Sequence, residues 1–183
     1  MPDVELMNGD EVRRALDRMA HEIVERFRGA QGLALIGIRT RGEFLAQRFQ
    51  AALEKLEGIK VPAGALDITV YRDDFDALQE KIKVAGSQID FEVRGRHIIL
   101  VDDVLYTGRT VRAAIDAIMD LGRASSIALA VLVDRGHREL PIKADFVGRT
   151  VATAGAEEIQ VQLREVDGQD RVLLKKAGIP NSQ

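Results

Sequence analysis

Apolar positions along the chain follow two spacings, one typical of helices and the other of buried strands. From Asn8 onward they recur at helical spacing, and Asn8 with Glu11 three residues later has the pattern of a helix N-terminus. The runs Leu33 to Ile38, Ile98 to Val101 and Ile127 to Val133 are continuously apolar, as in strands that are buried on both faces. The pattern therefore predicts buried strands packed against amphipathic helices.

Two further helical patterns stand between these strands. One extends from about Gly42 to Leu56 before Gly58, and the other extends from Thr110 to Leu121 before Gly122. Strands that alternate with helices imply a parallel sheet with helices on both faces. We therefore predict an α/β fold with a central, mostly parallel sheet flanked by helices, built as one domain over residues 1–183.

The middle of the chain contains a long polar stretch. A strand is predicted over Leu66 to Tyr71, and the polar residues 72–88 that follow have poor periodicity. This stretch is long for a passive connection in a compact domain. We therefore expect residues 72–88 to form a lid.

The C-terminal part has a different pattern. Apolar residues occupy every second position over residues 159–163, and Asp167-Gly168 is a hairpin turn signal before Arg171 to Leu174. The sequence therefore predicts a C-terminal β-hairpin.

Composition and charge narrow the class of protein. The 183 residues suffice for one core, and 46% hydrophobic with 30% charged residues is a globular composition. No apolar run approaches the roughly 20 residues of a membrane span, and the start lacks signal-peptide features, so we expect a cytoplasmic protein without a membrane partner. The lack of cysteine excludes thiolate chemistry. A net charge of -3 argues against whole-surface nucleic-acid binding but allows a local basic patch.

The segment from Ile98 to Thr110 carries the most specific chemistry. Asp102 and Asp103 follow a buried strand, and the carboxyl ends of parallel strands open into the crevice where such sheets bind ligands. Adjacent carboxylates can accept hydrogen bonds from neighbouring sugar hydroxyls and help to hold a hydrated magnesium ion. We therefore predict that both aspartates are catalytic and bind substrate and magnesium.

The loop after these carboxylates opens a helix. Backbone N–H groups at a helix N-terminus bind phosphate, and a glycine such as Gly108 permits close approach. A strand end followed by an ordinary helix cap is the alternative, and either half of the segment alone would favour it. Together they predict a ribose-5-phosphate site that includes Val104, Leu105, Tyr106, Thr107, Gly108, Arg109 and Thr110.

A second loop, Gly37 to Gly42, also connects a strand to a helix. It should open into the same crevice and present Thr40, Arg41 and backbone amides to an anion. A capping turn with solvated arginines is the alternative for this loop taken alone.

These segments resemble known enzymes. The run from Ile98 to Thr110 resembles the phosphoribosyl-pyrophosphate signature of type I phosphoribosyltransferases. Together with the run from Leu129 to Ile142, it resembles the PyrR family of pyrimidine operon attenuators and uracil phosphoribosyltransferases, over nearly the whole chain. The resemblance implies transfer of the phosphoribosyl group from 5-phosphoribosyl-1-pyrophosphate to uracil, giving UMP, with Mg2+ as the cofactor. It also implies a pyrophosphate loop at Gly37 to Gly42, with a cis peptide expected at Thr40-Arg41.

The resemblance also assigns further residues. It places Arg135 in the nucleotide site and a hood, about residues 150–175, over the base near Ile159. The transition state resembles an oxocarbenium ion that water would capture, which gives the lid a purpose, and Arg72 in it could neutralise departing pyrophosphate. The chain departs from the family at Ala152 to Ala156 and at Asp17.

Regulation is the second implied activity. Such proteins bind leader mRNA of pyrimidine genes when uridine nucleotides, UMP and UTP, are plentiful. Between Asp134 and Thr150, four lysines and arginines stand against three acidic residues. The resemblance places RNA there, on a face that we expect to be widened in a homodimer or larger homo-oligomer. The candidate RNA-binding residues are Arg18, His21, Arg138, Lys143 and Arg149.

Two alternatives remain. The first is an RNA-binding nucleotide sensor with weak catalysis, because a fold alone does not establish an activity. The second is a salvage phosphoribosyltransferase for another base, such as a purine, without an RNA function.

Overall fold

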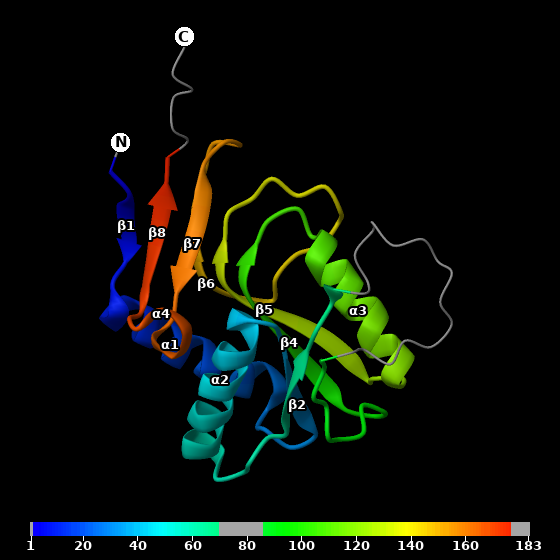
Figure 1. Ribbon diagram of the computed structural model, residues 1–183. Coiled ribbons are helices and arrows are strands. Elements are labelled where there is room, and N and C mark those ends of the chain that lie inside the picture. The colour runs from blue at the N-terminus through cyan, green and yellow to red at the C-terminus, as the bar shows by residue number, and fades with distance from the viewer. Residues whose placement is uncertain (1, 70–85, 177–183) are drawn as a thin grey trace.

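The computed structural model describes residues 2–69 and 86–176 (Figure 1). In these ranges the strands are β1 (Val4–Met7), β2 (Leu33–Ile38), β3 (Ala63–Leu66), β4 (His97–Leu105), β5 (Ser126–Asp134), β6 (Phe146–Thr150), β7 (Glu158–Gln162) and β8 (Arg171–Lys175). The helices are α1 (Gly9–Phe27), α2 (Arg41–Glu57), α3 (Arg109–Leu121) and α4 (Arg164–Asp167).

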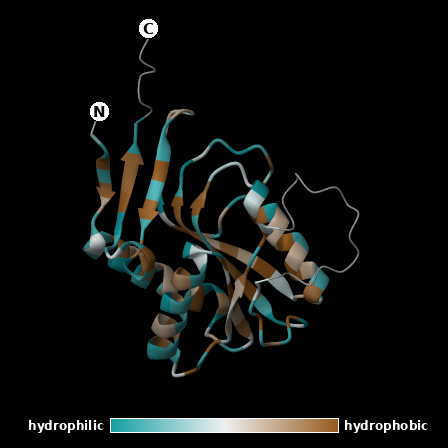
Figure 2. Cartoon of the chain, viewed as in Figure 1, coloured by the Kyte–Doolittle hydropathy of each residue, from teal (hydrophilic) through white to brown (hydrophobic). Residues whose placement is uncertain are grey.

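The central sheet confirms the predicted fold class. Within the described residues its strand order is β3-β2-β4-β5-β6, and every neighbouring pair is parallel. Successive residues of a strand point to opposite faces, so β2 contributes Leu33 and Leu35 to one core and Ala34 and Ile36 to the other. The central strands are accordingly mostly hydrophobic (Figure 2).

Helices cover both faces of this sheet (Figure 1). Apolar residues of α1 and α2 belong to the first core, and those of α3 belong to the second. The predicted N-terminus of α1 is confirmed, because Asn8 and Glu11 each accept a hydrogen bond at 2.9 Å from the backbone N–H of the other. Across the described residues, no helix combines the length and the apolar character needed to cross a membrane.

A second, antiparallel sheet contains β1, β8 and β7, and we call it the hood sheet. The predicted hairpin is confirmed by the pairing of β7 with β8, but its connection is longer than a two-residue turn. Asp167 and Asp170 accept hydrogen bonds from the backbone N–H of Leu163 and Arg164, which favours the short helix α4 at this place. Gly168, with φ of 76°, ends that helix.

Of the strand predicted over Leu66 to Tyr71, the described part, residues 66–69, overlaps a strand only at Leu66, the last residue of β3, and Val70 and Tyr71 lie outside the described residues. Ala63–Leu66 pairs with β2, and the carboxylate of Asp67 then accepts hydrogen bonds from Thr69, which turns the chain out of the sheet. Gly64 explains why this strand has no conspicuous apolar pattern: a Cβ there would lie 2.8 Å from the carbonyl oxygen of Gln88. The close approach requires a residue without a side chain.

Candidate functional site

The paired carboxylates lie at the predicted edge of the sheet. The last β4 residue paired with β2 is Val101, opposite Gly37, so Asp102 and Asp103 extend beyond β2. Asp102 is only 8% exposed, whereas Asp103 is half-buried. The backbone N–H of Asp103 donates to Oδ1 of Asp102 at 2.9 Å, and that of Val104 donates to Oδ1 of Asp103 at 2.8 Å. These bonds fix both carboxylates at the open end of the strand.

Burial and the neighbouring charge of Asp103 raise the pKa of Asp102 well above its ordinary value. The two carboxyls therefore favour a bound proton, whereas a bound divalent cation would favour their ionised form. In the described part of the chain, no group of three acidic, histidine or cysteine side chains is arranged to hold a metal ion. Two carboxylates without a cage suit a magnesium ion that keeps water and substrate oxygens as its other ligands.

Two glycines let the second loop pack directly on β4. A Cβ at Gly37 would lie 2.2 Å from the carbonyl oxygen of Gly42, and a Cβ at Gly42 would lie 2.5 Å from that of Val101. The loop therefore lies against the strand end, backbone on backbone, next to Asp102. This contact joins the two sequence segments that we predicted to form one site.

The cis peptide expected at Thr40-Arg41 lies one residue earlier, at Arg39-Thr40. The bond before Arg41, the first residue of α2, is not cis. Thr40 is exposed at this turn, whereas the guanidinium of Arg41 is turned toward the hood and lies 2.9 Å from Asp167. The side chain that we expected to face an anion is thus held by a carboxylate.

Arg39 is a site residue that the sequence analysis missed. Its Nε is buried without a hydrogen bond in the described residues, although Oε2 of Glu43 lies 3.2 Å away. Asp67 accepts hydrogen bonds from Thr69, and these bonds together with the Arg39 charge lower the pKa of the Asp67 carboxyl. Arg72 and most of the expected lid, residues 72–85, lie outside the described residues.

The predicted phosphate loop, Leu105 to Arg109, leads directly into the N-terminus of α3. Gly108 has φ of 93° and precedes α3, which begins at Arg109, one residue before the predicted start. The hydroxyl of Thr107 accepts from the backbone N–H of Arg109 at 3.3 Å. Leu105 is buried in the core, so it can contribute only its backbone to a ligand.

The run from Asp134 to Ile142 braces this loop from outside. Backbone N–H groups of Glu139 and Leu140 donate to the carbonyl oxygen of Thr107 at 2.9 Å and 3.2 Å. The Glu139 carboxylate also lies 2.7 Å from Nε of Arg109. The sequence analysis missed this support, because no local pattern shows that two separated loops contact each other.

Arg138, one of the predicted RNA-binding residues, is half-buried and also belongs to the brace. Its guanidinium donates to the carbonyl oxygens of Tyr106 and Ile142 at 2.7 Å and 2.8 Å, and to the carboxylate of Asp134 at 2.7 Å. Three simultaneous partners fix the side chain in place. Arg138 therefore holds the backbone of the phosphate loop.

Arg135 connects the phosphate loop to the hood. It is 6% exposed, its guanidinium lies 4.0 Å from the Tyr106 ring centroid, and its Nε donates to Oγ1 of Thr153 at 3.2 Å. Nε2 of His137 donates to the carbonyl oxygen of Thr153 at 2.6 Å. The segment Ala152 to Ala156, where the chain departs from the family pattern, thus supplies contacts to Arg135. Ile159 is buried in the first core, so only its backbone can face a ligand.

Two candidate RNA-binding residues, Arg18 and Arg149, lie at β6. Arg18 on α1 donates to the carbonyl oxygens of Val147 and Gly148 at 3.2 Å and 2.6 Å. Arg149 donates to the carbonyl oxygen of Leu6. Both arginines, like His21 and Lys143, are exposed.

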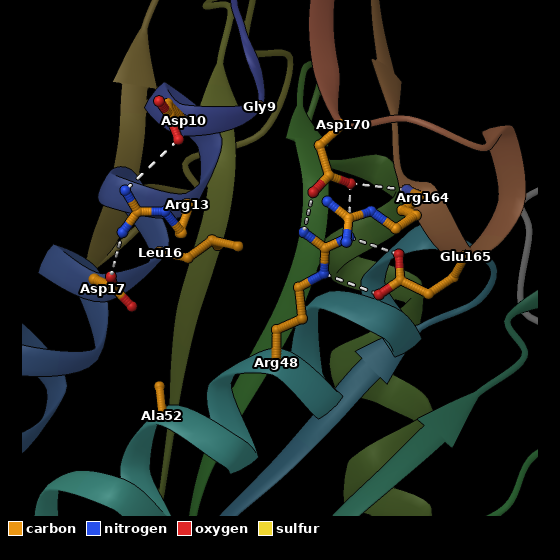
Figure 3. Close-up of a pocket in the computed structure, with 10 residues that line it drawn as sticks. All are labelled: Gly9, Asp10, Arg13, Leu16, Asp17, Arg48, Ala52, Arg164, Glu165 and Asp170. Carbon is orange, nitrogen blue, oxygen red and sulfur yellow. Dashed lines mark hydrogen bonds and ion pairs between the residues drawn. The ribbon is translucent and has the colours of Figure 1, made fainter.

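A cavity lies away from these residues. It has a volume of about 650 Å³ between α1, α2 and the hood, and none of the predicted site residues lines it (Figure 3). Arg48 in its wall lies 2.6 Å from Glu165 and 2.7 Å from Asp170. These bonds raise the pKa of Arg48 and attach the hood to α2.

Comparisons with known proteins point to one family. The family model described as a phosphoribosyl transferase domain matches residues 5–165. The chain is 58% identical over 170 residues to the bifunctional protein PyrR of Thermus thermophilus, covering 93% of this chain and 94% of the relative. It is 52% identical over 176 residues to that of Enterococcus faecalis, covering 96% and 98%.

Solved structures support the fold. The hypoxanthine phosphoribosyltransferase of Trypanosoma cruzi matches with a TM-score of 0.72 and 16% identity, over 95% of this chain and 97% of that one. That of Staphylococcus aureus matches with a TM-score of 0.65 and 16% identity, over 94% and 92%. At this identity the likeness concerns the fold alone.

Proposed function

We propose a function from the premise that this chain belongs to the phosphoribosyltransferase family and, within it, to the bifunctional PyrR proteins. It transfers the phosphoribosyl group of 5-phosphoribosyl-1-pyrophosphate to uracil, giving UMP and pyrophosphate. It also regulates pyrimidine genes by binding their leader mRNA in response to UMP and UTP.

One observation carries the catalytic part. Asp102 and Asp103 lie at the same strand end as two backbone loops, Gly37 to Gly42 and Leu105 to Arg109. Carboxylates suit ribose hydroxyls, and each loop opens a helix whose N-terminus attracts a phosphate group. A sugar with one phosphate at carbon 5 and a pyrophosphate at carbon 1 presents those three features together.

The residues of the chain then have separate tasks. The loop from Leu105 to Arg109 binds the 5-phosphate, while Thr40 and Arg41 bind the pyrophosphate that leaves. Asp102 and Asp103 orient the ribose. They would also hold Mg2+ together with substrate oxygens, and that ion would offset the charge of the leaving group. Arg135 and the backbone of β7 enclose the base.

The test is UMP formation from uracil, measured beside hypoxanthine and orotate as acceptors. We expect uracil to react fastest, and we expect excess chelator to stop transfer. Transfer to hypoxanthine alone would replace this function by purine salvage. No transfer to any base, together with intact nucleotide binding, would favour the nucleotide sensor.

The RNA-binding surface that we propose consists of Arg18, His21, Lys143 and Arg149. All four side chains are exposed, and Arg18 on α1 contacts the strand β6 that carries Arg149. A second copy of the chain, in a homodimer or larger homo-oligomer, would widen this surface. Phosphate contacts by these cations would make RNA binding decrease with salt.

A further inference from the structure

Two arginines on one face of α2 attach the hood to the central domain. Arg41 and Arg48 are seven residues apart, which is about two helical turns, so their side chains point in similar directions. Both meet the connection between β7 and β8: Arg41 pairs with Asp167, and Arg48 pairs with Glu165 and Asp170. Only Arg41 also belongs to the proposed pyrophosphate loop.

The contact with Asp167 occupies one edge of the Arg41 guanidinium. Nε and Nη2 donate to the carboxylate at 2.9 Å to 3.3 Å. Nη1 makes no hydrogen bond within residues 2–69 and 86–176. A guanidinium has five N–H donors in a rigid plane, so its second edge stays available to an anion while the first is held.

Asp167 is itself fixed. Its Oδ2 accepts a hydrogen bond from the backbone N–H of Leu163 at 2.8 Å, and its side chain is 18% exposed. Burial alone would raise the pKa of this carboxyl, but the Leu163 hydrogen bond and Arg41 outweigh it and lower the pKa. The carboxylate therefore remains charged and immobile beside Arg41 at neutral pH.

We propose that Asp167 is a positioning residue for phosphoribosyl transfer, which holds Arg41 with its outer edge toward the pyrophosphate of the substrate. This inference rests on the proposed function. A free arginine side chain would lose its rotamer freedom when it binds an anion, whereas Asp167 fixes Arg41 before the substrate arrives. The same contact makes the position of the hood depend on the pyrophosphate loop.

The negative charge of Asp167 repels an anion, whereas its contact with Arg41 favours anion binding. The direction of the change in KM therefore shows which effect is larger. Replacing Asp167 by asparagine removes a negative charge near the pyrophosphate, which alone would strengthen binding. It also frees Arg41. We expect the loss of orientation to dominate, because the Arg41 charge already offsets that of Asp167.

The experiment compares Asp167→Asn with the unmodified chain in steady-state transfer of phosphoribosyl to uracil. Asparagine keeps an oxygen for the Leu163 N–H, so the turn is retained. We expect KM for phosphoribosyl pyrophosphate to rise about two- to fivefold, as for an ion pair whose side chains are 28% and 18% exposed. Inhibition by inorganic pyrophosphate should weaken in parallel, while the dissociation constant of UMP, which carries no pyrophosphate, should not change.

Asp170→Asn is the matched control. Asp170 accepts from a backbone N–H of the same turn and pairs with Arg48, but it does not touch Arg41. This variant should lower Tm about as much as Asp167→Asn and leave KM for phosphoribosyl pyrophosphate unchanged. Equal KM increases in the two variants would overturn the proposal, because they would show a general effect of loosening the hood.

A double-mutant cycle tests whether Asp167 acts through Arg41. In an Arg41→Gln background, Asp167→Asn should have no further effect on KM for phosphoribosyl pyrophosphate. An unchanged or lower KM in Asp167→Asn alone, with normal transfer by the unmodified chain, would refute the positioning role and leave the proposed function intact. Absence of transfer by the unmodified chain would overturn both.

Discussion

The guanidinium of Arg135 lies 4.0 Å from the centroid of the Tyr106 ring. Tyr106 belongs to the phosphate loop, and Arg135 also donates to Thr153 of the segment that leads into the hood. This cation–π contact therefore connects the phosphate side of the site to the base side.

Tyr106→Leu should loosen Arg135, because leucine offers no aromatic face to the buried cation. A cation–π contact of this kind contributes about 0.5–2 kcal/mol, so we expect KM for uracil to rise by about 2- to 30-fold. Tyr106→Phe keeps the ring and should show the smaller increase. Steady-state kinetics with uracil as the varied substrate measures both, and equal KM values for the two variants would contradict a role for the ring.

Asp102→Asn should abolish most transfer and yet stabilise the fold at high pH. Because burial raises the pKa of Asp102, the folded chain retains a proton that the unfolded chain releases as pH rises above 3.8. Ionised Asp102 thus lowers the free energy of unfolding as pH rises. The free energy of unfolding of Asp102→Asn does not decrease in this way. Each kcal/mol by which it exceeds that of the unmodified chain raises Tm by about 2–4 °C.

Thermal unfolding at pH 5 and pH 8 measures this effect. Between these values, Tm of the unmodified chain should fall more than Tm of Asp102→Asn. A parallel change in both chains would show that Asp102 carries no proton in the folded state.

Gly42→Ala should damage both stability and substrate binding. A Cβ at this position would lie 2.5 Å from the carbonyl oxygen of Val101, so the pyrophosphate loop must move away from β4. Overpacking of this kind costs about 1–3 kcal/mol. Gly155→Ala is the control, because a Cβ there meets nothing within 4 Å. Tm and KM for phosphoribosyl pyrophosphate should change in the first variant only.

Arg149→Ala should weaken leader mRNA binding without changing UMP synthesis. Loss of one phosphate contact reduces the slope of log affinity against log salt by about 0.7–0.9. Arg123→Ala removes an exposed arginine next to α3 and serves as the control. If both variants bind RNA as the unmodified chain does over a salt series, the proposed RNA-binding surface is wrong.

Patterns within one segment predicted most of the central domain. Buried strands such as β2 and β5 are continuous apolar runs, and the apolar residues of α1 repeat at helical spacing. The local order of apolar residues is therefore enough to predict whether each segment is a strand or a helix. β1 and β6 were missed, because Val4–Met7 and Phe146–Thr150 each have only one fully buried residue. Short edge strands depend on partners that a local pattern does not reveal.

The distinction between local patterns and contacts of distant segments also applies to the site. Asp102, Asp103 and the phosphate loop were predicted because their chemistry lies within one continuous segment. The pairing of Arg41 with Asp167 spans 126 residues, and that of Arg109 with Glu139 spans 30. Such contacts follow from the arrangement of strands in space, which sets distances that no local spacing encodes.

The brace formed by Arg138 and Glu139 leaves the phosphate loop supported on the side of α3, while Arg135 is anchored separately at Thr153. Although they are anchored at different places, the two halves of the proposed nucleotide site are linked by the contact of Arg135 with the Tyr106 ring. A redesign of base selectivity through the segment Ala152 to Ala156 would therefore also reach the phosphate loop. Selection of the acceptor and recognition of the donor are coupled in this fold.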